Sequence, residues 1–181
     1  MSSLTLSYHS FPGAEEINAI DAIAGDAHAT ICWMHTPEFG RAYALVEDAS
    51  ERCVSALRER AGDAFNPSPL IALAIVPSVD EALPPIIDAL YGRGGLAGVK
   101  SCVRAGDAII VEWDLERTGA AIVLDLVDVE IARFHARRVN HLLTPLPIAW
   151  SARIASEGLG APEISRDRVL EALLKDAYAV L

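Results

Sequence analysis

The chain has 181 residues, of which 52% are hydrophobic and 22% are charged, and its formal net charge is −10. A chain this apolar can bury a sizeable core, which excludes intrinsic disorder. The negative charge excludes an ordinary nucleic-acid-binding protein, because such proteins bind phosphates through a basic face.

The sequence also bears on the cellular compartment. No stretch reaches the roughly 18 apolar residues of a membrane span, and the first residues lack the pattern of a secretory signal. We therefore expect a cytoplasmic protein without a membrane partner. Many alanines and arginines with few lysines favour a bacterial source. Three cysteines without a CxxC pair predict buried, reduced thiols at Cys32, Cys53 and Cys102.

The first third of the chain predicts alternating strands and helices. Apolar and polar residues alternate where a half-buried strand is expected, and apolar residues recur three apart where a helix is expected. Thr36 and Pro37 resemble an N-cap followed by the first helical position, and Gly62 follows the last periodic residue. The predicted elements are strands at residues 4–8 and 28–34 and helices at residues 15–24 and 36–61.

The remaining two thirds predict a buried strand, a helix, three further strands and a helical end. Residues 70–76 form a continuous apolar run between two prolines, which is typical of a central strand buried on both faces. The other predicted elements are a helix near residues 85–92, strands at 99–104, 108–116 and 120–131, and helices beyond residue 144, the last at 166–181.

This order of elements predicts an α+β fold, with one mixed sheet and helices packed on it. A ferredoxin-like sandwich fits the middle of the chain, residues 28–129, and an α/β fold is the alternative. No internal repeat is visible. We expect one domain over residues 1–181, with a sheet-containing core at 1–143 and a helical segment at 144–181.

Four residues are candidates for ligand binding. His35 lies at a predicted strand-to-helix junction, where open α/β sheets bind ligands. Arg133, Arg137 and His141 are four residues apart and would line one face of a helix, where they could hold a phosphate or carboxylate. The sequence thus predicts a small anionic ligand. Loop hydrogen bonding and a solvated helix face are the alternative roles.

Two further sequence patterns could indicate a metal site or a phosphate-binding loop, and neither is interpreted as one. His28, Cys32 and His35 cluster on one predicted strand but do not share a face, so no metal site is predicted. The glycine-rich residues 91–98 leave a helix and enter a strand, the reverse of a phosphate-binding loop, so they are interpreted as a helix stop and turn.

Acidic residues gather on the predicted strand at 108–116. Glu112, Asp114 and Glu116 alternate along it, which is typical of a face exposed to solvent. Paired carboxylates can also bind Mg²⁺ or transfer protons, and this stays the alternative.

Three functions remain open at this stage. The absence of a catalytic motif favours a non-catalytic small-molecule-binding or regulatory module, expected to be a homo-oligomer. The alternatives are a small enzyme acting on an anionic metabolite and a structural or assembly protein that works through protein contacts. The sequence does not decide whether the chain is an enzyme.

Overall fold

The computed structural model describes residues 2–114 and 116–147 of the chain. The described residues divide into two compact units. Unit 1 comprises residues 2–70 and 143–147, and unit 2 comprises residues 71–114 and 116–142. Each unit contains a four-stranded sheet.

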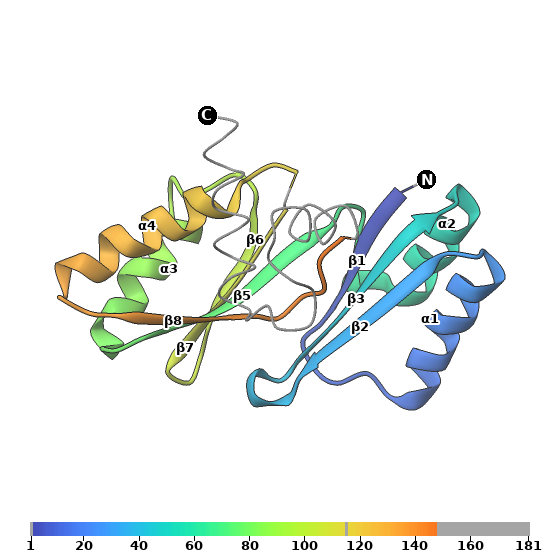
Figure 1. Cartoon of the computed structure of the whole chain (residues 1–181), viewed down its shortest axis with the longest axis horizontal. Coiled ribbons are helices and arrows are strands. Elements are labelled where there is room, and N and C mark those ends of the chain that lie inside the picture. The colour runs from blue at the N-terminus through green and yellow to red at the C-terminus, as the bar shows by residue number, and fades with distance from the viewer. Residues whose placement is uncertain (1, 115, 148–181) are drawn as a thin grey trace, which may run out of the picture. The chain divides into compact units, whose positions relative to one another are not determined.

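Unit 1 has the element order βαββαβ (Figure 1). Its sheet has the strand order β2-β3-β1-β4, and the neighbouring strands pair antiparallel. Its elements are β1 (Ser2–Tyr8), α1 (Ala14–Asp26), β2 (Thr30–Thr36), the 3₁₀ turn η1 (Pro37–Phe39), β3 (Arg41–Ala49), α2 (Glu51–Ala61), the 3₁₀ turn η2 (Gly62–Ala64) and β4 (Phe65–Asn66).

Helices α1 and α2 cover one face of this sheet (Figure 1). The core beneath them contains only apolar side chains and Cys53, because alternate residues of β1 and β3 point towards the helices. Burial of each large apolar side chain stabilises the unit by about 1.5–3 kcal/mol. The buried core residues are Leu4, Leu6, Ile20, Ala44, Val46, Ala49, Cys53 and Leu57.

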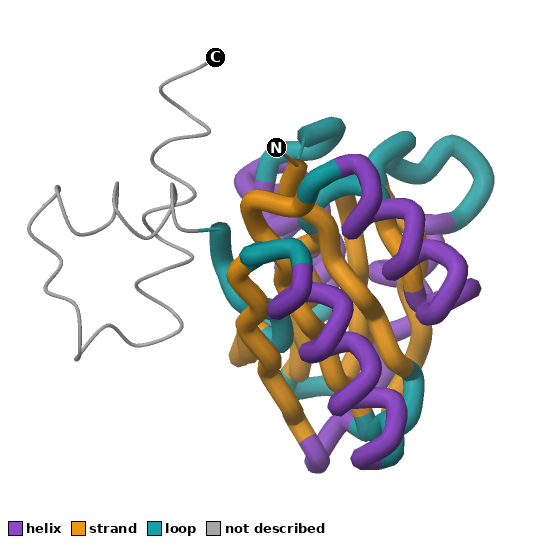
Figure 2. The backbone as a smooth tube through the Cα atoms, turned by 90° about the vertical axis from the view of Figure 1, so that its right-hand side faces the viewer, coloured by secondary structure: helices purple, strands orange, loops and turns teal. Residues whose placement is uncertain are grey.

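Unit 2 repeats the order βαββαβ. The strand order of its sheet is β6-β7-β5-β8. Figure 2, by contrast, faces α1 and α2 of unit 1, which lie along the strands of their sheet. The elements are β5 (Leu70–Pro77), the 3₁₀ turn η3 (Asp80–Ala82), α3 (Leu83–Tyr91), β6 (Val99–Ala105), β7 (Ala108–Asp114), α4 (Ala120–Arg133) and β8 (Arg138–Leu142).

The central buried strand predicted at residues 70–76 is confirmed. Strand β5 lies inside the sheet, and six of these seven residues are buried while Val76 is half-buried. A strand without polar residues is stable there because both of its faces are removed from water. The predicted hairpin of β6 and β7 is also confirmed, and the turn between them contains Gly106 with φ +65°.

The helix predicted over residues 36–61 is wrong in its first half. Pro37 begins only a single 3₁₀ turn, and Gly40 then adopts φ +63°, which reverses the chain into β3. The apolar residues of β3 were compatible with a helical stripe, but they pair with β1 and β2 on both sides. Helix α2 begins only after Ser50, whose side chain accepts a hydrogen bond from the Cys53 N–H.

The strand predicted over residues 120–131 is wrong, because this segment forms helix α4. Its β-branched residues favour a strand. However, Val123, Val127 and Ile131 are four residues apart and are all buried, whereas Asp125 and Asp128 are exposed. The burial of one face of the helix therefore outweighs the intrinsic preference of its β-branched residues for a strand.

The expectation that the acidic residues of β7 face solvent is also wrong. Glu112 and Asp114 are only 3% and 7% exposed, while Glu116, beyond the strand, is exposed. An Asp114 oxygen accepts a hydrogen bond from the Glu116 N–H at 2.9 Å. Every residue of β7 is buried, so both faces of this strand are removed from water.

The α+β class is confirmed, although the described residues contain two sheets and not one mixed sheet. The ferredoxin-like order occurs twice, at residues 2–66 and 70–142, and not once in the middle. The single domain stays a prediction. The final helix predicted at residues 166–181 lies outside the described residues. Among the described helices, none combines the length and the apolar character that crossing a membrane requires.

Candidate functional site

The predicted row of Arg133, Arg137 and His141 does not lie on a helix. Helix α4 ends at Arg133, whose guanidinium forms an ion pair with Glu130 at 3.0 Å. Arg137 lies in the following loop, where its backbone N–H donates to the Ser78 hydroxyl at 2.9 Å. His141 lies on β8, opposite Ala74 of β5. The helical spacing that motivated a common anion site is therefore absent.

His35 lies near the end of β2 and is exposed. Its imidazole ring stacks on the ring of Phe11, with the ring centroids 3.9 Å apart. The structure places His35 in unit 1, whereas Arg133, Arg137 and His141 belong to unit 2. A ligand role for these four residues stays a prediction.

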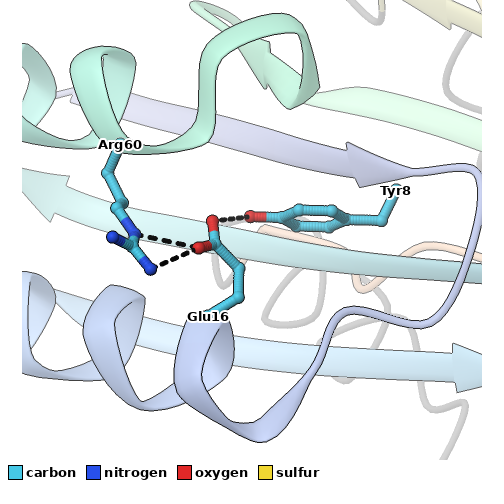
Figure 3. Close-up of polar contacts among 3 residues, drawn as sticks. All are labelled: Tyr8, Glu16 and Arg60. Carbon is cyan, nitrogen blue, oxygen red and sulfur yellow. Dashed lines mark hydrogen bonds and ion pairs between the residues drawn. The ribbon is translucent and has the colours of Figure 1, made fainter.

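Three polar side chains tie β1, α1 and α2 together in unit 1 (Figure 3). The Tyr8 hydroxyl donates to one Glu16 carboxylate oxygen at 3.3 Å, and Arg60 binds the other oxygen at 2.8 Å. We call these three residues the Glu16 clip. Burial, together with the negative charge and hydrogen bond of Glu16, raises the pKa of Tyr8 to about 12. The phenol therefore stays protonated at neutral pH.

A cleft opens at the other end of the same two helices. Helices α1 and α2 contact each other. The clip joins the first turn of α1 to the last turn of α2, whereas the cleft lies between the end of α1 and the start of α2. Its volume is about 340 Å³, which is within the range of small-ligand sites. The lining residues are Ile23, Asp26, Ala27, Ser50, Arg52, Cys53 and Ala56.

The lining of the cleft is polar and apolar in equal parts, and it includes charges of both signs. Arg52 and Asp26 are exposed, and neither takes part in an ion pair within the described part of the chain. By contrast, Arg60 pairs with Glu16, and Arg58 lies over the Phe65 ring. Arg52 thus has its guanidinium available for a ligand at the mouth of this cleft.

The thiol of Cys53 is one of the groups that line the cleft. Burial raises its pKa above the ordinary value, so the thiol stays protonated at neutral pH. A protonated, buried thiol packs as a small apolar group and does not attack a substrate. Of the three cysteines predicted to be buried, Cys53 and Cys102 are, but Cys32 on β2 is exposed.

A second cavity of about 530 Å³ lies beside α3 and β6 in unit 2. Its lining is more apolar and includes Leu83, Ile87 and the exposed Tyr91. The guanidinium of Arg104 at its rim already binds Asp80 at 3.3 Å and the Gly106 carbonyl. The cleft of unit 1 is therefore the better candidate for a polar ligand.

Sequence reasoning missed the α1–α2 cleft. Arg52 and Cys53 were assigned to the middle of a long predicted helix, whereas they lie in the first turn of α2. Ser50, a favourable N-cap residue followed by an acidic residue, was the signal that could have placed the helix start correctly. Within residues 2–114 and 116–147, no group of three or more His, Cys, Asp or Glu side chains is arranged to hold a metal ion.

No protein-family model and no curated protein matches this sequence. The chain is similar to several solved structures, at low TM-scores. An unknown protein from Galdieria sulphuraria is 10% identical and covers 79% of this chain and 99% of its own, with a TM-score of 0.31. The ligand-free regulatory subunit of aspartate kinase from Thermus thermophilus is 11% identical and covers 73% and 92%, with a TM-score of 0.29.

The third structure is a microcompartment protein from Desulfitobacterium hafniense. It is 18% identical and covers 81% of this chain and 96% of its own, with a TM-score of 0.25. Proteins with so little sequence identity can share a fold and have unrelated functions.

Proposed function

We propose that the chain is a non-catalytic, small-molecule-binding module with a regulatory role, and that its ligand carries a carboxylate or a comparable anionic group. The observation that carries this proposal is the α1–α2 cleft with the unpaired guanidinium of Arg52 at its rim. The proposal keeps the small anionic ligand expected from the sequence but moves it away from Arg133 and Arg137.

The chemistry of the cleft supports binding over catalysis. A guanidinium binds a carboxylate through two parallel N–H···O bonds, which orients the ligand. The apolar half of the lining, which includes Ile23 and Ala56, then takes up the ligand's hydrocarbon part. Because Cys53 remains protonated, the cleft supplies recognition without an activated nucleophile.

A thermal-shift screen of small carboxylates, phosphates and their neutral amides tests the proposal. A ligand at 100 times its dissociation constant adds about 2.7 kcal/mol to the free energy of unfolding, which a melting curve resolves. We expect a carboxylate to stabilise the protein and its neutral amide to have less effect.

Two variants then assign the binding to the cleft. Because a charge-assisted hydrogen bond is worth about 1.5–3 kcal/mol, Arg52→Ala should weaken binding about 10- to 100-fold. Ala56→Met should fill the cleft and also weaken binding. Arg93→Ala is the matched control, since Arg93 is an exposed arginine of unit 2. A ligand that binds Arg52→Ala and Ala56→Met as tightly as the native protein would refute the site.

A further inference from the structure

Strand β2 lies at the edge of the sheet of unit 1. All seven residues of Thr30–Thr36 pair with β3 in an unbroken antiparallel register. Within the described residues, β2 has a paired neighbour only on the β3 side. A straight edge strand of this kind offers backbone N–H and C=O groups to another strand.

The edge of β2 lacks the features by which proteins usually prevent such pairing. Its residues Thr-Ile-Cys-Trp-Met-His-Thr include no lysine, arginine, aspartate, glutamate or proline. The edge strand β6 of unit 2 differs from β2 in its charged side chains and in the regularity of its register. It carries Lys100 and Arg104, and its register shifts between Val99 and Ser101, as at a β-bulge. Of these two edge strands, β6 is thus protected and β2 is left open.

Apolar surface accompanies the open edge. Cys32 is exposed, Met34 is half-buried, and Phe11, stacked on His35, is 56% exposed. Exposed apolar groups beside a free strand edge are typical of an interaction site. In a chain with a net charge of −10, the side chains of β2 add no carboxylate to this edge, and the neighbouring Asp21 of α1 is engaged by the Trp33 indole N–H at 2.7 Å, which limits the repulsion that a second copy meets there.

We propose that two copies of the chain associate through β2, with the two strands antiparallel across a two-fold axis. An antiparallel edge is complementary to itself, which is what an isologous dimer requires. A pairing that uses the whole strand is centred on Trp33 and places Cys32 opposite Met34 of the partner subunit. From strand geometry, the two Cys32 Cα atoms then lie about 8 Å apart.

The experiment measures the mass of the protein in solution and compares variants of the two edges. Cys32→Lys puts a charge on the exposed edge of β2, and Thr30→Lys does the same at another exposed residue of this strand. Val103→Lys is the matched control, because Val103 is 40% exposed on the protected edge strand β6. Melting curves establish that each variant is folded.

We expect the native protein and Val103→Lys to be dimers. Cys32→Lys and Thr30→Lys should be folded monomers, or dimers weakened at least about tenfold. A short bismaleimide should join two native chains through Cys32, because Cys53 and Cys102 are buried, and Cys32→Ser should remain dimeric but not be joined.

Four results would overturn the proposal. One is a monomeric native protein, and another is a dimer that survives both lysine substitutions in β2. The third is a native dimer that the bismaleimide does not join. Equal loss of the dimer in Val103→Lys would likewise overturn it, since the effect would then not be specific to β2.

Discussion

Replacing Glu16 by glutamine removes the charge at the centre of the Glu16 clip while keeping the size of the side chain. Glu16 accepts from Tyr8 at 3.3 Å and from Arg60 at 2.8 Å, so one carboxylate joins the end of β1, the start of α1 and the end of α2. We expect Glu16→Gln to lower both the free energy of unfolding and the pKa of Tyr8.

The size of the expected loss in unfolding free energy follows from how exposed the Glu16 and Arg60 side chains are. The side chains of Arg60 and Glu16 are 39% and 25% exposed, so solvent screens their ion pair to about 0.5–1 kcal/mol. Loss of the negative charge from the first turn of α1 removes about 0.3–1 kcal/mol of interaction with the helix dipole. Glutamine can still accept from Tyr8. We therefore expect a total loss of about 1–2 kcal/mol.

Denaturant unfolding of a double-mutant cycle separates these effects. Glu16→Gln and Arg60→Gln, singly and together, give the coupling between the two side chains, which we expect to be about 0.5–1 kcal/mol. Ultraviolet titration of native protein against Tyr8→Phe isolates the pKa of Tyr8 in each background. In Glu16→Gln this pKa should fall below about 12 but stay above 10.0, because burial, the largest cause, remains.

Two results would refute this reasoning. Zero coupling between Glu16 and Arg60 would show that the ion pair does not form in solution. An unchanged pKa of Tyr8 in Glu16→Gln would show that burial alone raises it.

Three further outcomes follow from the structure. Leu57→Ala, which removes a fully buried side chain of α2, should cost about 2–5 kcal/mol of unfolding free energy in urea. Gly98→Ala should cost about 1–3 kcal/mol, because a Cβ atom there would overlap the Thr118 side chain. Gly25→Ala, with open space inside α1, is its control and should leave the free energy of unfolding unchanged or raise it by up to about 1 kcal/mol. The protonated form of Tyr8 is favoured in the folded state, so its contribution is present below pH 10 and lost as the pH rises to about 12. Tyr8→Phe should lack that part of the alkaline decline in melting temperature, and an identical decline in both proteins would contradict the pKa assignment.

Patterns of burial with a clear period could be predicted from the sequence. The alternation in β1 and the continuous apolar run of β5 each allow one secondary structure, because side-chain direction follows the period of the backbone. The first half of the helix predicted at residues 36–61 was wrong because a strand buried on both faces has no single period of apolar residues. Residues 42, 45, 46 and 49 satisfy a helical stripe, but β3 is buried on both faces and needs apolar residues at almost every position.

The binding cleft could not be predicted, because it depends on which helices lie side by side. Asp26 and Arg52 are 26 positions apart in the sequence and approach one cleft only because α1 and α2 pack antiparallel on one sheet. Local spacing instead drew attention to Arg133 and Arg137, whose supposed helical row is interrupted where α4 ends. Spacing identifies a common face only when the secondary structure is correct.

The repetition of the fold in the two units could not be predicted from the sequence for a related reason. Both units have the order βαββαβ, yet α2 is rich in charged residues, whereas the equivalent α4 is rich in valine and isoleucine. The fold requires only that one face of each helix is buried, and α2 meets this with Cys53 and Leu57. The other positions are therefore free to differ between the units. In α2 that freedom places Arg52 at the mouth of the cleft, so the two units share an architecture without having to share a ligand.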